Sequence, residues 1–148
     1  GKMTPNDPLL LQELRRDEGV RYVKYLDSVG VPTCGVGHNL KANPLPDGWT
    51  FPLSDEQVDG LLAADLLMTI SGLDAHLGWW RTLTCARQRV LVNMAFNLGV
   101  AGLLGFKNTL AAVQRGHYEQ AASGMMASKW ARQVGNRAVR LADMMRTG

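Results

Sequence analysis

Three side chains near the N-terminus have the types and spacing that acid–base chemistry on a sugar bond requires. Glu18 stands at the end of an apolar helical pattern, next to Gly19. Asp27 follows nine residues later in a turn, and Thr33 follows six residues after that on a returning strand. A sheltered carboxyl that protonates the leaving oxygen, paired with a wetter one, suits glycoside hydrolysis. Because Asp in turns and Glu at helix ends are common, the spacing alone leaves a structural role open.

Other kinds of site have little support in the sequence. The three histidines, His38, His76 and His117, occur without an HExxH or paired-cysteine pattern, so we expect no metal. The chain has no GxSxG elbow and no glycine loop that would cradle a phosphate, so we expect no cofactor. Cys34 and His38 are four residues apart on an extended strand, too far for a direct hydrogen bond. Cys34 and Cys85 are too few for a disulfide framework, and we expect buried free thiols.

Composition predicts one globular domain with an uneven charge distribution. The chain has 148 residues, of which 46% are hydrophobic and 20% charged. The nearest candidate for a membrane span, 61–73, contains Asp65, so we expect no stable membrane insertion. Residues 1–80 carry six Lys or Arg against eleven Asp or Glu, whereas residues 81–148 carry ten against two. This asymmetry fits a polyanionic partner for the basic half, or attraction between two lobes.

The elements that must position these residues begin with a helix and a hairpin. The first helix is expected to start at Pro8, with Asp7 as its cap, and to end at about Glu18. Strands over about 20–26 and 31–36 are expected to form an antiparallel hairpin around a turn. The following loop, 39–53, is expected to hold at most a ragged strand.

The remainder of the sequence is helical in pattern. Ser54 to Gln57 form a capping box that starts a helix running toward Leu73. Thr84 can cap a helix that ends before Gly99. Further short helices are expected at about 101–104, 108–115, 118–127 and 136–145. The sequence therefore predicts an α+β fold, with a small β-hairpin lobe and a larger helical lobe.

Several motifs along the chain match one known family. They are Asp17-Glu18-Gly19, Tyr25, Asp27, Gly30, Thr33, Gly35-Val36-Gly37-His38, Asp65, the stretches 93–99 and 105–110, Ser128-Lys129-Trp130, Asn136-Arg137-Ala138 and Arg146-Thr147-Gly148. In these motifs the chain resembles phage-type lysozymes, the endolysins of glycoside hydrolase family 24. The resemblance covers nearly the whole chain. It implies a single lysozyme-like domain over 1–148, with a cleft between two lobes. The small β lobe is expected at about 19–54 and the connecting helix at about 55–73. The helical lobe is expected to consist of about 80–148 together with the first helix.

The resemblance also implies a reaction and assigns roles in it. Glu18 would be the general acid, and Asp27 with Thr33 would position or activate the attacking water. The substrate implied is the β-1,4 bond from N-acetylmuramic acid to N-acetylglucosamine in bacterial peptidoglycan. The outcome implied is inversion, with the two carboxyls roughly 6.5–9.5 Å apart.

Matches outside the catalytic trio imply substrate contacts. Phe96 and Thr109 correspond to positions that line the saccharide cleft of the family. Asn39 and Gly124 occupy two further cleft positions but depart in type, since Asn39 replaces an apolar residue and Gly124 replaces an amide. Trp130 is expected in the core or in the cleft wall.

Other matches imply structural support for the site. His38 and Asp65 would form an ion pair that bridges the lobes. Two arginines of the last helix would face the acidic residues at the end of the first helix, with Arg137 opposite Glu18 and Arg140 opposite Asp17.

Two other functions remain open at this stage. A lytic transglycosylase would cyclise the sugar instead of admitting water, and a non-catalytic basic protein would bind the wall or disrupt membranes. For the lysozyme we expect a monomer that binds peptidoglycan glycan strands and no nucleic acid. As an endolysin it would stay in the host cytoplasm until a partner such as a holin released it to the periplasm and cell wall.

Overall fold

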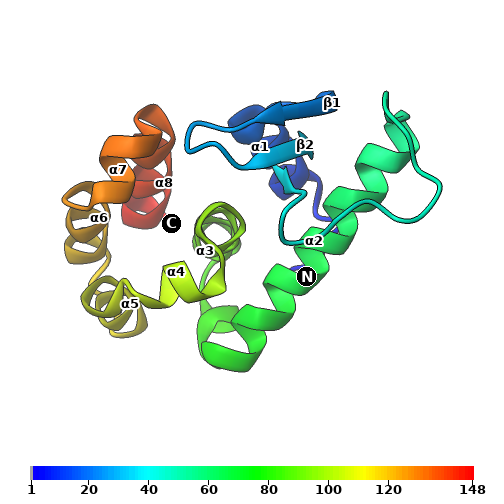
Figure 1. Ribbon diagram of the computed structural model, residues 1–148. Helices are drawn as coiled ribbons and strands as arrows, with labels where there is room; N and C mark the ends of the chain where they lie inside the picture. Colours follow the sequence, from blue (N-terminus) through cyan, green and yellow to red (C-terminus); the bar gives the residue numbers. More distant parts are fainter. Residues whose placement is uncertain (1) are drawn as a thin grey trace. The chain divides into compact units, whose positions relative to one another are not determined.

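The computed structural model describes residues 2–148 and divides into two compact units (Figure 1). The N-terminal unit is Thr4–Met68. The C-terminal unit is Thr69–Gly148 together with the start of the chain up to Met3. Within the described residues, helices predominate and one small antiparallel sheet is present, so the α+β prediction is confirmed.

The N-terminal unit begins with helix α1, Pro8–Glu18. Asp7 caps it, because its Oδ2 accepts a hydrogen bond of 3.0 Å from the Leu10 N–H. Leu10 and Leu14 are fully buried and anchor the helix in this unit. The division of the chain thus groups α1 with the sheet, whereas the sequence grouped it with the helical lobe.

Three strands follow in the order β1-β2-β3, and neighbours pair in antiparallel fashion. They are β1, Arg21–Leu26; β2, Pro32–Gly35; and β3, His38–Asn39. Tyr25 pairs with Thr33, and an irregularity between Arg21 and Tyr25 adds extra residues to β1. The region 39–53 was expected to hold at most a ragged strand. Its first residue instead completes a regular two-residue strand, which was too short for an alternating pattern to reveal.

Helix α2, Asp55–His76, runs from the N-terminal unit into the C-terminal one. Its capping box is present as predicted: Ser54 Oγ accepts from the Gln57 N–H at 3.1 Å, and Gln57 Oε1 accepts from the Ser54 N–H at 2.9 Å. One face carries the buried side chains, from Val58 to Leu73. The helix therefore starts where the sequence places it and extends one turn beyond the predicted end.

The C-terminal unit is built from short helices packed around α8. They are the 3-10 helix η1, Trp80–Thr82; α3, Cys85–Leu98; α4, Val100–Leu104; α5, Lys107–Gln114; α6, Tyr118–Met126; α7, Lys129–Val134; and α8, Asn136–Thr147. Helix α8 contacts α3, α6 and α7, and α5 contacts α6. Thr84 caps α3 as predicted, by accepting from the Arg87 N–H at 3.3 Å.

Two sequence predictions fail in this unit. Helix α7 was not expected, although Ser128 caps it by accepting from the Ala131 N–H at 3.2 Å and Gly135 follows its last residue. Cys85 was expected to be buried but is exposed, because it occupies the first turn of α3. None of the helices described is both long and apolar enough to cross a bilayer.

Candidate active site in the N-terminal unit and a pocket in the C-terminal unit

Glu18 is placed by the end of α1. Gly19 takes a φ of +75°, which favours glycine, and its N–H donates to the Arg15 carbonyl at 2.9 Å. This closes the helix one residue after Glu18. The Glu18 side chain is half-buried and packs against Gly37, in the turn between β2 and β3. The helix end and the sheet thus hold the carboxyl between them.

Asp27 is placed by the turn between β1 and β2. Its Oδ1 accepts hydrogen bonds from the Val29 N–H at 3.0 Å and from the Val31 N–H at 2.8 Å. These two bonds fix the orientation of the carboxylate and leave Oδ2 available to a water molecule. Asp27 itself is half-buried, and the tip residues beside it, Ser28 to Gly30, are exposed.

Thr33 lies on β2 and is buried. Its Oγ1 donates a hydrogen bond of 2.7 Å to the Val31 carbonyl, the residue whose N–H binds Asp27. The proton of the Thr33 hydroxyl is therefore donated to the backbone of the turn. While this bond stands, the hydroxyl oxygen can act toward a water only as an acceptor.

Tyr25 lies on β1 beside the candidate residues, and its contacts were not predicted from the sequence. It pairs with Thr33 across the sheet and stands two positions before Asp27, and the Arg21 guanidinium lies 4.5 Å from its ring centroid. Burial raises the pKa of the phenol, the negative charges of Glu18 and then Asp27 raise it further, and Arg21 opposes them. The charges of both Glu18 and Asp27 thus contribute to the raised pKa of this one phenol.

His38 and Asp65 form the expected ion pair. His38 is buried, its Nδ1 lies 2.7 Å from Asp65 Oδ2, and its Nε2 lies 2.8 Å from the Asn43 carbonyl oxygen. Burial lowers the pKa of His38, but the hydrogen bond and charge of Asp65, with the Asn43 carbonyl, outweigh it and raise the pKa above its ordinary value. Both residues belong to Thr4–Met68, so the pair joins β3 to α2 within one unit rather than bridging two.

Cys34 is the register partner of His38, so the two lie opposite each other despite their separation along the chain. The reason given for excluding a nucleophile pair was therefore wrong, but the geometry excludes it in another way. Both ring nitrogens of His38 already have partners, and Cys34 is fully buried. Burial also raises the pKa of the Cys34 thiol, which disfavours the nucleophilic thiolate.

Asn39 is exposed and pairs with Thr33 at the end of the sheet. Its Oδ1 accepts from the Lys41 N–H at 2.9 Å and from the Ala42 N–H at 3.0 Å. The carbonyl end of the side chain thus shapes the following loop. A substrate contact by Asn39 stays a prediction.

The remaining predicted site residues lie in the C-terminal unit. Phe96 on α3 and Thr109 on α5 are half-buried. A Cβ atom at Gly124 would lie 2.5 Å from Thr109 Oγ1, so the threonine hydroxyl fills the space of a side chain at position 124. Arg137 on α8 is buried, and its Nε donates to Asn93 Oδ1 at 2.9 Å. The structure thus brings Thr109 and Gly124 together.

The contacts predicted for Arg137 with Glu18 and for Arg140 with Asp17 would join residues of the two units. Both contacts stay predictions. Arg140 itself is half-buried on α8.

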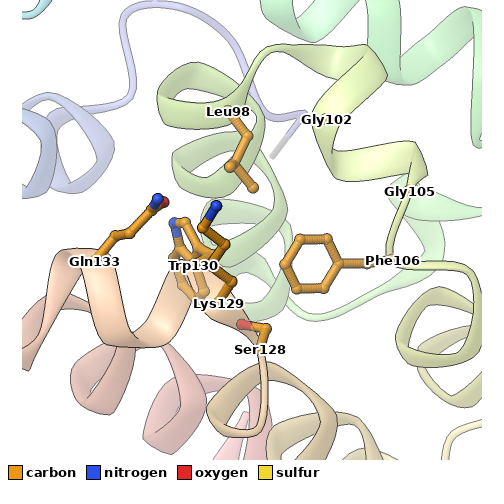
Figure 2. Close-up of a pocket in the computed structure, with 8 residues that line it drawn as sticks. All are labelled: Leu98, Gly102, Gly105, Phe106, Ser128, Lys129, Trp130 and Gln133. Carbon is orange, nitrogen blue, oxygen red and sulfur yellow. The ribbon is translucent and has the colours of Figure 1, made fainter. Parts of the chain in front are cut away.

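The C-terminal unit also has a pocket of about 510 Å³ (Figure 2). It is lined by Leu98, Gly102, Gly105, Phe106, Ser128, Lys129, Trp130 and Gln133. Phe106 and Trp130 meet edge to face, with ring centroids 6.2 Å apart, and Trp130 Nε1 donates to Asn97 Oδ1 at 2.8 Å. Trp130 is both buried and part of the pocket wall. The pocket was missed because its residues come from two separate segments, neither of which carries a signal alone.

Comparison with known proteins identifies the family of the chain. The family model described as phage lysozyme matches residues 15–145. The pre-baseplate central spike protein Gp5 of Enterobacteria phage T4 is 30% identical over 159 residues, which cover 94% of this chain and 28% of that protein. The chain therefore spans about a quarter of the length of Gp5.

Two further relatives match over most of their own length. A probable T4-type lysozyme of Dictyostelium discoideum is 24% identical over 156 residues, which cover 91% of this chain and 92% of that protein. The endolysin of Salmonella phage P22 is 29% identical over 118 residues, which cover 78% of this chain and 77% of that protein. With a family match that extends from α1 to the last helix, the chain belongs to the phage lysozyme family.

Proposed function

We propose that this protein is a muramidase that hydrolyses the β-1,4 bond from N-acetylmuramic acid to N-acetylglucosamine in peptidoglycan. The observation that carries the proposal is the pairing of two differently placed carboxylates. Glu18 is half-buried at the end of α1 and packs against Gly37, and Asp27 is half-buried in the turn between β1 and β2, where the Val29 and Val31 N–H groups hold its carboxylate. Membership of the phage lysozyme family supports a glycosidase built on these residues.

In this mechanism Glu18 is the general acid. It donates its proton to the glycosidic oxygen as the bond from that oxygen to the anomeric carbon breaks. The proton thus moves from the enzyme to the leaving sugar.

Asp27 would handle the water. Its Oδ1 is held by two backbone N–H groups, which keep the carboxylate oriented while Oδ2 receives a proton from the attacking water. Thr33 would accept a hydrogen bond from the same water, since its own proton is donated to the Val31 carbonyl. Water then adds to the anomeric carbon from the face opposite the leaving group, with inversion.

Analysis of the products tests this proposal. We expect digested peptidoglycan to carry reducing N-acetylmuramic acid ends, and we expect the first product seen by NMR to be the α-anomer. Anhydro-muramic ends would identify a lytic transglycosylase instead, and a β-anomeric first product would exclude the inverting role of Asp27. The absence of glycan cleavage, with wall binding retained, would identify a non-catalytic wall-binding protein.

The biological setting that we propose is lysis of a bacterial host. The relative from Salmonella phage P22 is named an endolysin, which supports a role in lysis. In this setting the enzyme would be a monomer that stays in the host cytoplasm until a holin lesion releases it. Expression in a bacterial host with and without a membrane-permeabilising agent tests this setting. Lysis only after permeabilisation is expected, and lysis without it would contradict the need for a holin.

A further inference from the structure

Gly37 lies in the short turn that joins β2 to β3, and the side chain of Glu18 rests against it. The backbone φ of Gly37 is +60°. A Cβ atom at this position would lie 2.6 Å from Glu18 Oε1, 2.8 Å from Cδ and 3.0 Å from Cγ. Favourable contacts between such atoms lie at roughly 3.5–4.0 Å. The outer half of the Glu18 side chain therefore occupies the space that any side chain at position 37 would need.

From this packing we infer that Gly37 is a positioning residue for the Glu18 carboxyl. Because Gly37 has no side chain, the carboxyl of the proposed acid can pack directly against its backbone. With any larger residue there, the carboxyl must move by about the shortfall in contact distance, which approaches 1 Å. The inference rests on the proposed function, because displacement of Glu18 changes the rate only if Glu18 is the acid.

The effect on the carboxyl can be separated from the effect on folding. The atoms that a new Cβ would meet belong to the outer part of one flexible side chain and not to the backbone or the core. The unfavourable positive φ is the other consequence of a substitution at Gly37. Displacement of Glu18 therefore changes catalysis much more than it changes packing.

The last residue of β2 provides a matched control. Gly35 has the same φ of +60°, but its added Cβ would meet only Val58 Cγ1 at 3.8 Å and Leu61 Cδ1 at 3.9 Å, which are ordinary contacts. Gly35→Ala thus introduces the same backbone conformation for an alanine without touching Glu18. The difference between the two variants isolates the contact with the carboxyl.

The experiment compares Gly37→Ala, Gly35→Ala and the unsubstituted protein on purified peptidoglycan. We expect Gly37→Ala to lower kcat by about 100-fold with KM within about twofold, because a misplacement near 1 Å at the reacting group has that order of effect. We expect Gly35→Ala to keep kcat within about threefold. Thermal unfolding temperatures should fall by similar amounts in both variants. Equal losses of kcat in the two variants, or a normal kcat in Gly37→Ala, would overturn the inference.

A second substitution guards against poor folding of Gly37→Ala. Asparagine adopts positive φ more readily than alanine, so Gly37→Asn keeps the added Cβ with less backbone strain. The same loss of kcat is expected. A direct readout is the carboxyl ¹³C signal of Glu18 in protein labelled at glutamate, assigned with Glu18→Gln. Its chemical shift should change in the Gly37 variants and not in Gly35→Ala, and an unchanged chemical shift in all of them would contradict the positioning role of Gly37.

The outcomes also separate this inference from the proposed function. If Glu18→Gln retains normal turnover, the proposed function itself fails. If Glu18→Gln is inactive while Gly37→Ala and Gly37→Asn are normal, only the role of Gly37 fails.

Discussion

The buried ion pair between His38 and Asp65 should make the stability of the fold depend on pH in one particular direction. Its atoms are 2.7 Å apart, and the side chains of His38 and Asp65 are 4% and 18% exposed. Removing one partner of a fully buried pair costs about 3–5 kcal/mol. Because Asp65 keeps some contact with solvent, we expect Asp65→Asn to destabilise the protein by about 3 kcal/mol when His38 is charged.

The sign follows from the raised pKa of His38. The unfolded histidine titrates near 6.5, so the stabilisation from the charged pair is fully present below about pH 6.5. It is lost as pH rises through the higher pKa of the folded state. The amide introduced by Asp65→Asn can still hydrogen-bond a neutral His38, whose Nε2–H stays on the Asn43 carbonyl. The cost of the substitution should therefore shrink at high pH.

Thermal unfolding followed by circular dichroism from about pH 5 to pH 8 measures this effect. At the acidic end the Tm of Asp65→Asn should be lower by roughly 6–12 °C, because 1 kcal/mol shifts Tm by about 2–4 °C in a domain of this size. Asp47→Asn, in an exposed loop, is the control and should unfold like the unsubstituted protein. A Tm difference that stays constant with pH, or grows as pH rises above 6.5, would refute the reasoning.

Three further predictions concern the site, a helix cap and the charge distribution. Glu18→Gln and Asp27→Asn should each lower the pKa of Tyr25 in an ultraviolet titration assigned with Tyr25→Phe, since each removes a charge that raises it; an unchanged titration would mean that the carboxylates are not neighbours of the phenol. Ser54→Ala should lower the free energy of unfolding by about 1 kcal/mol, because it removes a helix cap. Urea unfolding measures this against Ser71→Ala, an exposed control within α2, and equal stabilities of the two variants would contradict the cap. Because residues 81–148 carry ten Lys or Arg against two Asp or Glu, binding to purified cell wall should weaken as salt rises, and binding independent of ionic strength would reject an electrostatic contribution.

Local signals in the sequence were sufficient to predict where a helix begins or ends when a single residue determines the backbone conformation there. Asp7 and Pro8 start α1, Gly19 ends it, and Ser54 with Gln57 starts α2, because caps and positive φ act within a few residues. The strand β3 was missed because two residues do not display a period, and α7 was missed although Ser128 and Gly135 mark its two ends.

The candidate site was less accessible to sequence reasoning than the elements. Spacing nominated Glu18 and Asp27 only as one option, and the partner of His38 came from the family resemblance. The contact of Gly37 with Glu18, and the pairing of Tyr25 with Thr33, depend on which backbone atoms meet across the sheet. Such contacts join residues up to 19 positions apart and follow from strand register, which the sequence alone left unspecified.

The most direct test of the central claim is the turnover of Glu18→Gln on purified peptidoglycan. Glu56→Gln, which changes an exposed carboxyl in the first turn of α2, is the matched control. Since the amide cannot donate the acid proton, release of reducing ends should fall by at least about 100-fold in Glu18→Gln, with wall binding and Tm retained, while Glu56→Gln stays active. Normal release of reducing ends by a correctly folded Glu18→Gln would contradict the assignment of Glu18 as the acid.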